Sequence, residues 1–194
     1  MLPFTQPDKE EKTVAKLEIG QYLPDFEYVT PFSAGHTLAE TAEKAPKTAL
    51  VFLRYWGCPL CQYDIHLLAQ AHADLTANGG QLLVVLQSDP AGLAQQLGSA
   101  NALPFPIICD PEQKLYKAFC IAPAASMAKM ADLKMVGRII KATRLGFKHG
   151  AYEGDEQQLP AAFVIDGERK ILYAHYAASV SDMPDTAELA KLLS

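Results

Sequence analysis

Short apolar runs alternate with polar and turn-forming segments along most of the chain. The runs 48–56 (TALVFLRYW) and 81–87 (QLLVVLQ) are typical of buried strands, and 105–111 (FPIICDP) predicts a third strand. Apolar residues at helical spacing predict a helix over 59–78, which the sequence Asn-Gly-Gly ends, and a short helix follows over 90–101. Strands and helices that alternate in this way predict crossover units on a partly parallel sheet.

The two ends of the chain extend this pattern. Residues 17–38 alternate apolar residues with Gly and Pro and predict small strands and turns. Two strand-like runs within 161–176 meet at Asp166-Gly167, a good hairpin signal, and a helix is predicted over 185–193. We therefore expect one α/β domain over residues 1–194, a central mixed sheet flanked by helices, with a loosely ordered segment at 1–13.

Residues 123–150 read as one long helix inserted before the hairpin. This segment holds six Lys or Arg and one Asp, although the whole chain carries a formal net charge of −5. One stripe is basic and holds Lys134, Arg138, Lys141 and Lys148, whereas other stripes hold Met127, Met130, Val136, Ile139 and Ile140. We expect this apolar stripe to pack on the protein's own sheet or, alternatively, to form a homodimer.

Composition and charge exclude several classes of function. The chain has 49% hydrophobic and 20% charged residues, and its negative net charge gives no reason to expect nucleic acid as a partner. No apolar run approaches the roughly 18–20 residues of a membrane span, and the N-terminal residues lack the pattern of a secretory signal. These features predict a cytoplasmic protein with no membrane partner.

Cys58 and Cys61 stand close together in the stretch RYWGCPLCQ and carry the main chemical signal. A tetrahedral zinc site needs four ligands, commonly as two close pairs, but Cys109 and Cys120 lie eleven positions apart and no histidine pair completes a set. We therefore expect no metal, and the thiol chemistry favoured below needs no organic cofactor. A pair of merely buried cysteines and a redox couple are the remaining alternatives.

The redox alternative rests on the junction between the predicted strand and the predicted helix. Gly57 permits a turn, and Pro59 fits the first helical position, where its missing N–H costs nothing. Cys58 would then lie at the helix N-terminus, where free N–H groups and the helix dipole favour a thiolate. Arg54 at the strand end could add positive charge, and Cys61 is close enough to form a disulfide with Cys58.

The order of the segments LPDFEYV, TALVFLRYWGCPLC, LLVVLQSDP, FPIICDP, YKAF and LPAAFVID resembles the thioredoxin-fold superfamily of alkyl hydroperoxide reductases and thiol-specific antioxidants. CPLC together with GDEQQLPAAFVID is most similar to its peroxiredoxin-like branch, which commonly has a helical insertion before the FVID strand. The resemblance covers about residues 17–176. It implies a thioredoxin-like α/β fold with an inserted helix at about 123–147.

The resemblance also implies roles for individual residues. Cys58 would be the attacking thiol and Cys61 its resolving partner, and Pro160 would be the cis-proline held against the active-site disulfide. Typical peroxiredoxins have Pro-x-x-x-Thr-x-x-Cys, whereas this chain has Val51 and Tyr55 at the matching positions. Tyr55 could donate a phenolic hydrogen bond to peroxide in place of threonine.

Several other side chains have two interpretations. Trp56 either contacts partner proteins or caps the core, and Arg138 or Arg144 either supplies a guanidinium to peroxide or is solvated. His66 and His72 are expected to be surface or packing residues, because His66 lies about two turns beyond Cys58. The remaining cysteines are expected to be an inert strand thiol (Cys109) and a thiol that is auxiliary if its loop nears the site (Cys120).

These inferences favour a thiol-dependent antioxidant oxidoreductase that reduces peroxides or disulfides. Its partners would be a peroxide or disulfide substrate and an external dithiol reductant such as a thioredoxin-like protein. One alternative is a thioredoxin-type disulfide reductase without peroxidase activity. Another is a non-catalytic binding module that keeps the fold and holds a partner through Trp56 or the basic helix.

Overall fold

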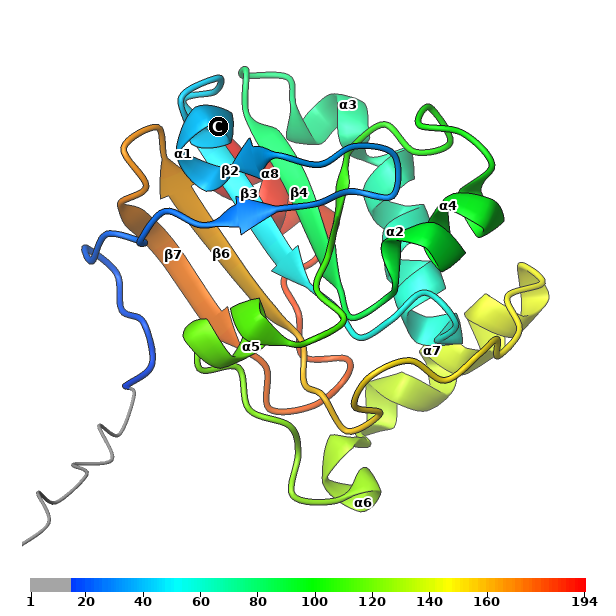
Figure 1. Ribbon diagram of the computed structural model, residues 1–194. Coiled ribbons are helices and arrows are strands. Elements are labelled where there is room, and N and C mark those ends of the chain that lie inside the picture. Colours follow the sequence, from blue (N-terminus) through cyan, green and yellow to red (C-terminus); the bar gives the residue numbers. More distant parts are fainter. Residues whose placement is uncertain (1–14) are drawn as a thin grey trace, which may run out of the picture.

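A computed structural model describes residues 15–194, and the expectation for residues 1–13 lies outside this range. Its centre is a five-stranded sheet in the order β5-β4-β3-β6-β7 (Figure 1). The strands are β3 (Lys47–Phe52), β4 (Gln81–Leu86), β5 (Ile107–Cys109), β6 (Ala161–Asp166) and β7 (Ile171–Tyr176). β3, β4 and β5 run parallel, whereas β6 pairs antiparallel with both β3 and β7. The predicted mixed sheet and terminal hairpin are confirmed.

Helices cover both faces of this sheet. One face packs on α2 (Pro59–Gln70), α3 (His72–Leu75), α4 (Pro90–Leu97) and α8 (Thr186–Leu193), and this layer contains both Cys58 and Cys61. The other face packs on α1 (Leu38–Ala42) and α5 (Lys114–Ala118). Because alternate residues of a strand point to opposite faces, Val51 lies in the cysteine layer and Phe52 in the other. This two-sided burial explains why the central strands read as continuous apolar runs.

A short two-stranded sheet precedes α1. It pairs β1 (Glu27–Tyr28) with β2 (His36–Thr37) in antiparallel register. This confirms the small strands predicted for residues 17–38. Tyr28 is buried and its hydroxyl bonds to Thr41 of α1 at 2.7 Å. This contact ties the N-terminal sheet to the layer that lies opposite the cysteines.

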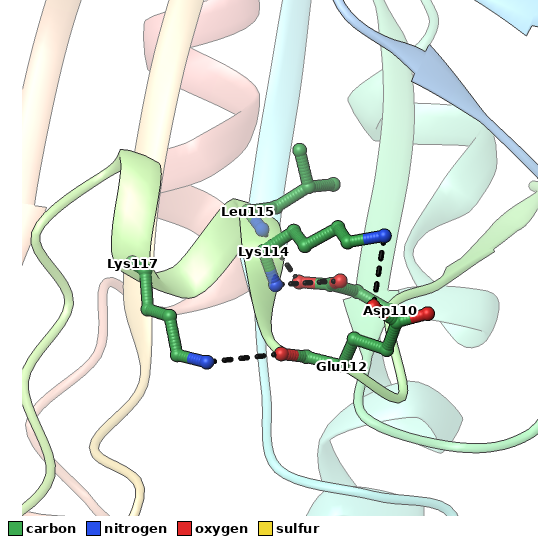
Figure 2. Close-up of polar contacts among 5 residues, drawn as sticks. All are labelled: Asp110, Glu112, Lys114, Leu115 and Lys117. Atoms are coloured by element: carbon green, nitrogen blue, oxygen red, sulfur yellow. Dashed lines mark hydrogen bonds and ion pairs between the residues drawn. The ribbon is translucent and has the colours of Figure 1, made fainter.

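Asp110 organises the turn between β5 and α5 (Figure 2). Its carboxylate accepts hydrogen bonds from the backbone N–H groups of Lys114 at 2.9 Å and Leu115 at 2.7 Å, which satisfies free donors at the helix start. The helix carries Tyr116, whose hydroxyl donates to the carbonyl of Leu53 at 2.5 Å. The capped helix thereby supports the backbone that leads from β3 to the cysteines.

The helix predicted over 59–78 is divided in the structure. α2 ends at Gln70, Ala71 has non-helical angles (φ −89°, ψ 2°), and α3 continues for a single turn. The prediction of one helix is therefore wrong at this point. The bend at Ala71 directs α3 toward α8 and lets Leu75 enter the core, which local helical periodicity does not report.

The inserted segment also forms two helices where one was predicted over 123–150. They are α6 (Met127–Met130) and α7 (Leu133–Arg144), and both lie to one side of the sheet in Figure 1. Ala131 is extended (ψ 141°), and Asp132 caps α7 by accepting the N–H of Met135 at 2.8 Å. The helix ends because Gly146 has φ +84°, a left-handed conformation that favours glycine.

The inserted segment packs only partly on the rest of the protein. Met130 and Ala142 are buried, whereas Val136, Ile139 and Ile140 are exposed. The expected packing of the apolar stripe on the sheet is therefore correct for Met130 and wrong for Met127, Val136, Ile139 and Ile140, which are all exposed. Within residues 15–194, no helix has the length and apolar character needed to cross a bilayer.

Candidate active site

Cys58 lies where β3 has ended and α2 begins. It is the N-cap of α2, with extended angles (φ −81°, ψ 119°), and Pro59 occupies the first turn. Its Sγ accepts a hydrogen bond from the backbone N–H of Cys61 at 3.3 Å. The sulfur therefore takes the capping place usually filled by a Ser or Asp oxygen, and the free N–H groups of the helix start stabilise a negative charge on it.

Arg54 provides a second donor to the same sulfur. Its Nη2 lies 2.9 Å from Cys58 Sγ, and its Nη1 donates to the carbonyl of Glu156 at 2.8 Å. Glu156 is 102 positions away in sequence, so the orientation of the guanidinium is fixed by a distant segment. The arginine is held on one side by a backbone carbonyl and presents its other side to the thiol.

The two cysteines differ in acidity. A hydrogen bond from the Cys61 side chain, together with the positive charge of Arg54, lowers the pKa of the Cys58 thiol below its ordinary value despite burial. Burial raises the pKa of Cys61 well above its ordinary value, and the neighbouring Cys58 adds to this rise. The pair therefore consists of one thiolate-forming cysteine and one cysteine that stays protonated.

Tyr55 is buried, and its hydroxyl is already occupied. The hydroxyl donates to Glu156 Oε1 at 3.2 Å and lies 3.2 Å from His149 Nε2. Burial, followed by the negative charge of Cys58, raises the pKa of this phenol, so it stays protonated. The suggested hydrogen bond from Tyr55 to peroxide would have to replace the bond to Glu156.

A segment that we call the strap, residues 148–158, crosses over the cysteine motif. The backbone N–H of Gly150 donates to the carbonyl of Gly57 at 2.8 Å. A Cβ on Gly57 would lie 2.2 Å from the carbonyl oxygen of Ala151, so this crossing requires glycine at position 57. Gly57 was expected to permit a turn, and the structure shows that it also makes room for the backbone of the strap.

Side chains fasten the strap to the end of β4. Ser88 Oγ donates to Glu153 at 2.5 Å and also accepts the backbone N–H of Trp56 at 2.9 Å. Gln87 Oε1 accepts the N–H of Asp155 at 2.6 Å. Cys58 itself is only 1% exposed, so atoms around it must move before a substrate reaches the sulfur.

Asp64 lies one turn beyond Cys61 on α2. It forms an ion pair with Arg138 of α7, and burial outweighs this pairing and raises the pKa of Asp64 to about 6. A small cavity is lined by Arg54, Cys61 and Asp64 together with Pro160. Arg138 therefore binds a carboxylate behind the motif and is not placed to hold peroxide on Cys58.

The structure places Pro160 near Cys61 but corrects its expected geometry. All peptide bonds of residues 15–194 are trans, including Leu159–Pro160, so the cis-proline prediction is wrong. The carbonyl of Pro160 accepts the N–H of Ala177 at 3.2 Å, and the residue itself is buried. The residue directly precedes β6, where the missing N–H of a proline is tolerated.

The structure also places the other side chains that the sequence singled out. Trp56 is half-buried against the core, and the rings of His66 and His72 pack on Phe147 and Phe105. Cys109 is a buried strand thiol, as expected, and burial raises its pKa to about 12. Cys120 donates to the carbonyl of Ala15 near the N-terminal segment. Arg144 is exposed, which agrees with a solvated charge.

Sequence reasoning missed the three residues that complete the site: His149, Glu156 and Asp64. The first two belong to the strap, whose path over the motif has no local sequence signal. Asp64 carried a usable signal, since it falls on the face of α2 that includes Cys61, three positions earlier. Among residues 15–194 no cluster of three or more potential metal ligands occurs.

A family model described as "AhpC/TSA antioxidant enzyme" matches residues 67–179, more than half of the chain. The chain belongs to this family. The matched region begins after Cys61, so the AhpC/TSA assignment rests on the sheet, the insertion and the strap and is independent of the cysteine motif. The sequence resemblance to thioredoxin-fold peroxiredoxin-like enzymes, which are thiol-dependent redox proteins, is confirmed.

Proteins similar to this AhpC/TSA protein include a thiol-disulfide oxidoreductase by sequence and peroxiredoxins by fold. The thiol-disulfide oxidoreductase ResA of Geobacillus kaustophilus is 24% identical over 115 residues, which cover 58% of this chain and 62% of that relative's length. A yeast mitochondrial 1-Cys peroxiredoxin has a TM-score of 0.65 at 15% identity, covering 91% of this chain and 74% of that one. Peroxidoxin BcpB of Mycobacterium tuberculosis has a TM-score of 0.63 at 12% identity, with 91% and 96% covered. The structural likenesses establish a shared fold.

Proposed function

We propose that this chain is a thiol-dependent oxidoreductase in which Cys58 is the nucleophile and Cys61 the resolving thiol. The observation that carries the proposal is the pair of donors on Cys58 Sγ, Arg54 Nη2 at 2.9 Å and the Cys61 N–H at 3.3 Å. Two donors on one sulfur stabilise the thiolate, which is the reactive form. A merely structural cysteine pair would not need a guanidinium aimed at one sulfur.

With a peroxide, the Cys58 thiolate attacks one oxygen, the O–O bond breaks, and the leaving alkoxide or hydroxide takes up a proton. Cys58 becomes a sulfenic acid, and Cys61, still a thiol, condenses with it to a disulfide and releases water. An external dithiol, such as that of a thioredoxin-like protein, then exchanges with the disulfide and returns both cysteines to the reduced state. No metal or organic cofactor takes part in this cycle.

The second candidate is a disulfide reductase without useful peroxidase activity. It is favoured by Tyr55, which occupies the position of the peroxiredoxin threonine and whose hydroxyl is bonded to Glu156. In this cycle Cys58 attacks a substrate disulfide to form a mixed disulfide, and Cys61 displaces the product thiol. The same two cysteines serve both candidates, and only the oxidant differs.

Stopped-flow oxidation of the reduced protein by hydrogen peroxide and by a small disulfide separates the candidates. Fast oxidation by peroxide supports the first, and turnover of the disulfide alone supports the second. Inertness toward both would overturn both and favour a non-catalytic binding module.

Trapping assigns the roles of the two cysteines. We expect Cys61→Ser to stop after the first step, with a dimedone adduct or a mixed disulfide on Cys58 that mass spectrometry locates. Cys58→Ser should abolish both reactions, and Cys109→Ser serves as the matched control with normal turnover. An adduct on Cys109 or Cys120 in place of Cys58 would contradict the assignment.

A further inference from the structure

Helix α7 presents an apolar stripe to solvent, on the side that faces away from the protein. Leu133, Val136 and Ile140, which we call the outer stripe, are spaced by three and four residues and so share one face. They are 96%, 58% and 47% exposed, respectively. The opposite face of the helix holds the fully buried Ala142 and the partly buried Met135. The helix is therefore held by one face and leaves its second apolar face without cover.

Positive charge borders this stripe. No acidic residue occurs between positions 133 and 152, whereas the segment contains five Lys or Arg. Arg138 turns inward to Asp64 and the ring of Tyr63. The others are exposed, and three of them, which we call the basic flank, lie on the helix itself: Lys134, Lys141 and Arg144. In a chain of net charge −5, this concentration of exposed positive charge is local to the insertion.

We propose that the outer stripe and the basic flank bind the surface of an anionic membrane. An interfacial helix buries an apolar face at the boundary between headgroups and acyl chains, while flanking Lys and Arg contact anionic headgroups. The lysine side chains are long enough to stay at the headgroup level while the stripe enters. α7 lies at the outside of the molecule beside α2, so it can lie flat on a surface without rearrangement of the sheet (Figure 1).

Composition favours a lipid surface over the other occupants of such a face. The cores of protein interfaces are enriched in aromatic residues, Met and Arg and depleted in Lys. The outer stripe and the basic flank hold three aliphatic residues, two lysines and one arginine, and no aromatic residue. A second copy packed symmetrically would place one basic flank against the same flank of its partner, which like charges oppose. Surface binding of this kind needs no helix long enough to span the bilayer.

Vesicle sedimentation of the full chain tests this proposal independently of any thiol activity. We expect binding to phosphatidylcholine vesicles that contain one-third phosphatidylserine, little binding to phosphatidylcholine alone, and release at high salt, which screens the charges. Lys134→Gln/Lys141→Gln should weaken partitioning about 25-fold, since each basic residue near the surface contributes about fivefold. Leu133→Ser/Ile140→Ser should weaken it about 10-fold or more.

Matched controls lie on other parts of the surface. Lys44→Gln/Lys191→Gln removes the same charge, and Leu172→Ser removes an apolar side chain of β7 that is 39% exposed. Both should bind as the wild type does, and all variants should keep its melting temperature. The proposal is overturned if the wild type does not bind anionic vesicles or if the stripe variant binds as well as the wild type. It is also overturned if the wild type forms a dimer that Leu133→Ser/Ile140→Ser dissociates and does not bind vesicles. In that case the outer stripe is an interface with a second copy.

Discussion

Arg54 and Asp64 show how single side chains acquire chemical roles from burial and from the charges beside them. Arg54 is oriented by a carbonyl of the strap and donates to Cys58. Asp64 keeps a raised pKa although it is paired with Arg138, because removal of the carboxylate from water outweighs the attraction of the cation. Each residue makes a separate, measurable prediction.

Arg54→Met should raise the pKa of Cys58. The substitution removes both a hydrogen bond to Sγ and a nearby positive charge, and an opposite charge at this range typically shifts a pKa by about 1–3 units. Alkylation of Cys58 at a series of pH values, followed by mass spectrometry, measures the change. Arg144→Met, at an exposed arginine of α7, should leave the titration as in the wild type; an unchanged titration in Arg54→Met would remove Arg54 from the site.

Asp64→Asn should flatten the pH dependence of stability. The folded protein binds the Asp64 proton more tightly than the unfolded chain does, since its pKa is raised from 3.8 to about 6. The contribution of this group to stability is therefore present below the unfolded pKa and is lost as the pH rises through about 6. Between about pH 4 and pH 7, the free energy of unfolding measured with urea should fall by about 2 kcal/mol in the wild type because of this group. The variant should lack this fall. Asp74→Asn, at an exposed carboxylate, should keep the wild-type slope.

At the scale of elements, the strap and α2 meet through two glycine backbones. Gly150 donates to Gly57 at 2.8 Å, and this close approach places the strap directly over the N-terminus of α2. The strap also supplies Glu156 to Arg54 and Tyr55. The element that packs on Gly57 is thus the same one that orients the arginine beside Cys58.

Gly57→Ala should displace the strap. The new Cβ would lie 2.2 Å from a backbone oxygen, a contact that no rotamer change can relieve. We expect a loss of about 1–3 kcal/mol in the free energy of unfolding and faster alkylation of Cys58 by a bulky maleimide. Gly137→Ala is the matched control: a Cβ there meets nothing within 4 Å, and the helix should gain about 0.5–1 kcal/mol. Slow alkylation in Gly57→Ala, equal to that of the wild type, would show that the strap does not limit access to Cys58.

At the scale of the whole molecule, the sheet separates two hydrophobic layers, and only one of them contains the cysteines. The opposite layer is dominated by aromatic rings; the centroid of Phe52 lies 4.8 Å from that of Phe119 and 5.9 Å from that of Phe163. This division makes global stability and site chemistry separable by mutation.

Phe52→Ala should lower the free energy of unfolding by about 3–5 kcal/mol, because it leaves a cavity among buried rings. The titration of Cys58 in the folded variant should match the wild type, since Phe52 points away from the cysteine layer. Chemical denaturation and pH-dependent alkylation measure the two quantities separately. Phe32→Ala, at an exposed ring, should change stability by less than about 0.5 kcal/mol. A shifted Cys58 titration in Phe52→Ala would show that the layers are coupled.

The sequence by itself determined the elements and the local geometry of the cysteine motif. Apolar runs and helical spacing are local properties, so β3, β4, the hairpin and the start of α2 at Cys58 could be predicted from neighbouring residues. The pairing of Cys58 with Cys61 follows from one turn of helix. The same logic failed at Ala71 and Ala131, where packing against α8 and capping by Asp132 divide helices that periodicity alone would continue.

Only the tertiary structure decided what surrounds the sulfur and which face of α7 is free. The carbonyl of Glu156 reaches Arg54 across 102 positions, and Tyr55 meets His149 across 94, separations at which sequence spacing carries no geometric information. An amphipathic pattern likewise shows that α7 has distinct faces but not which one packs on the protein. The packed side carries Ala142, Met135 and the ion pair of Arg138 with Asp64, contacts between segments that the chain brings together only when it folds.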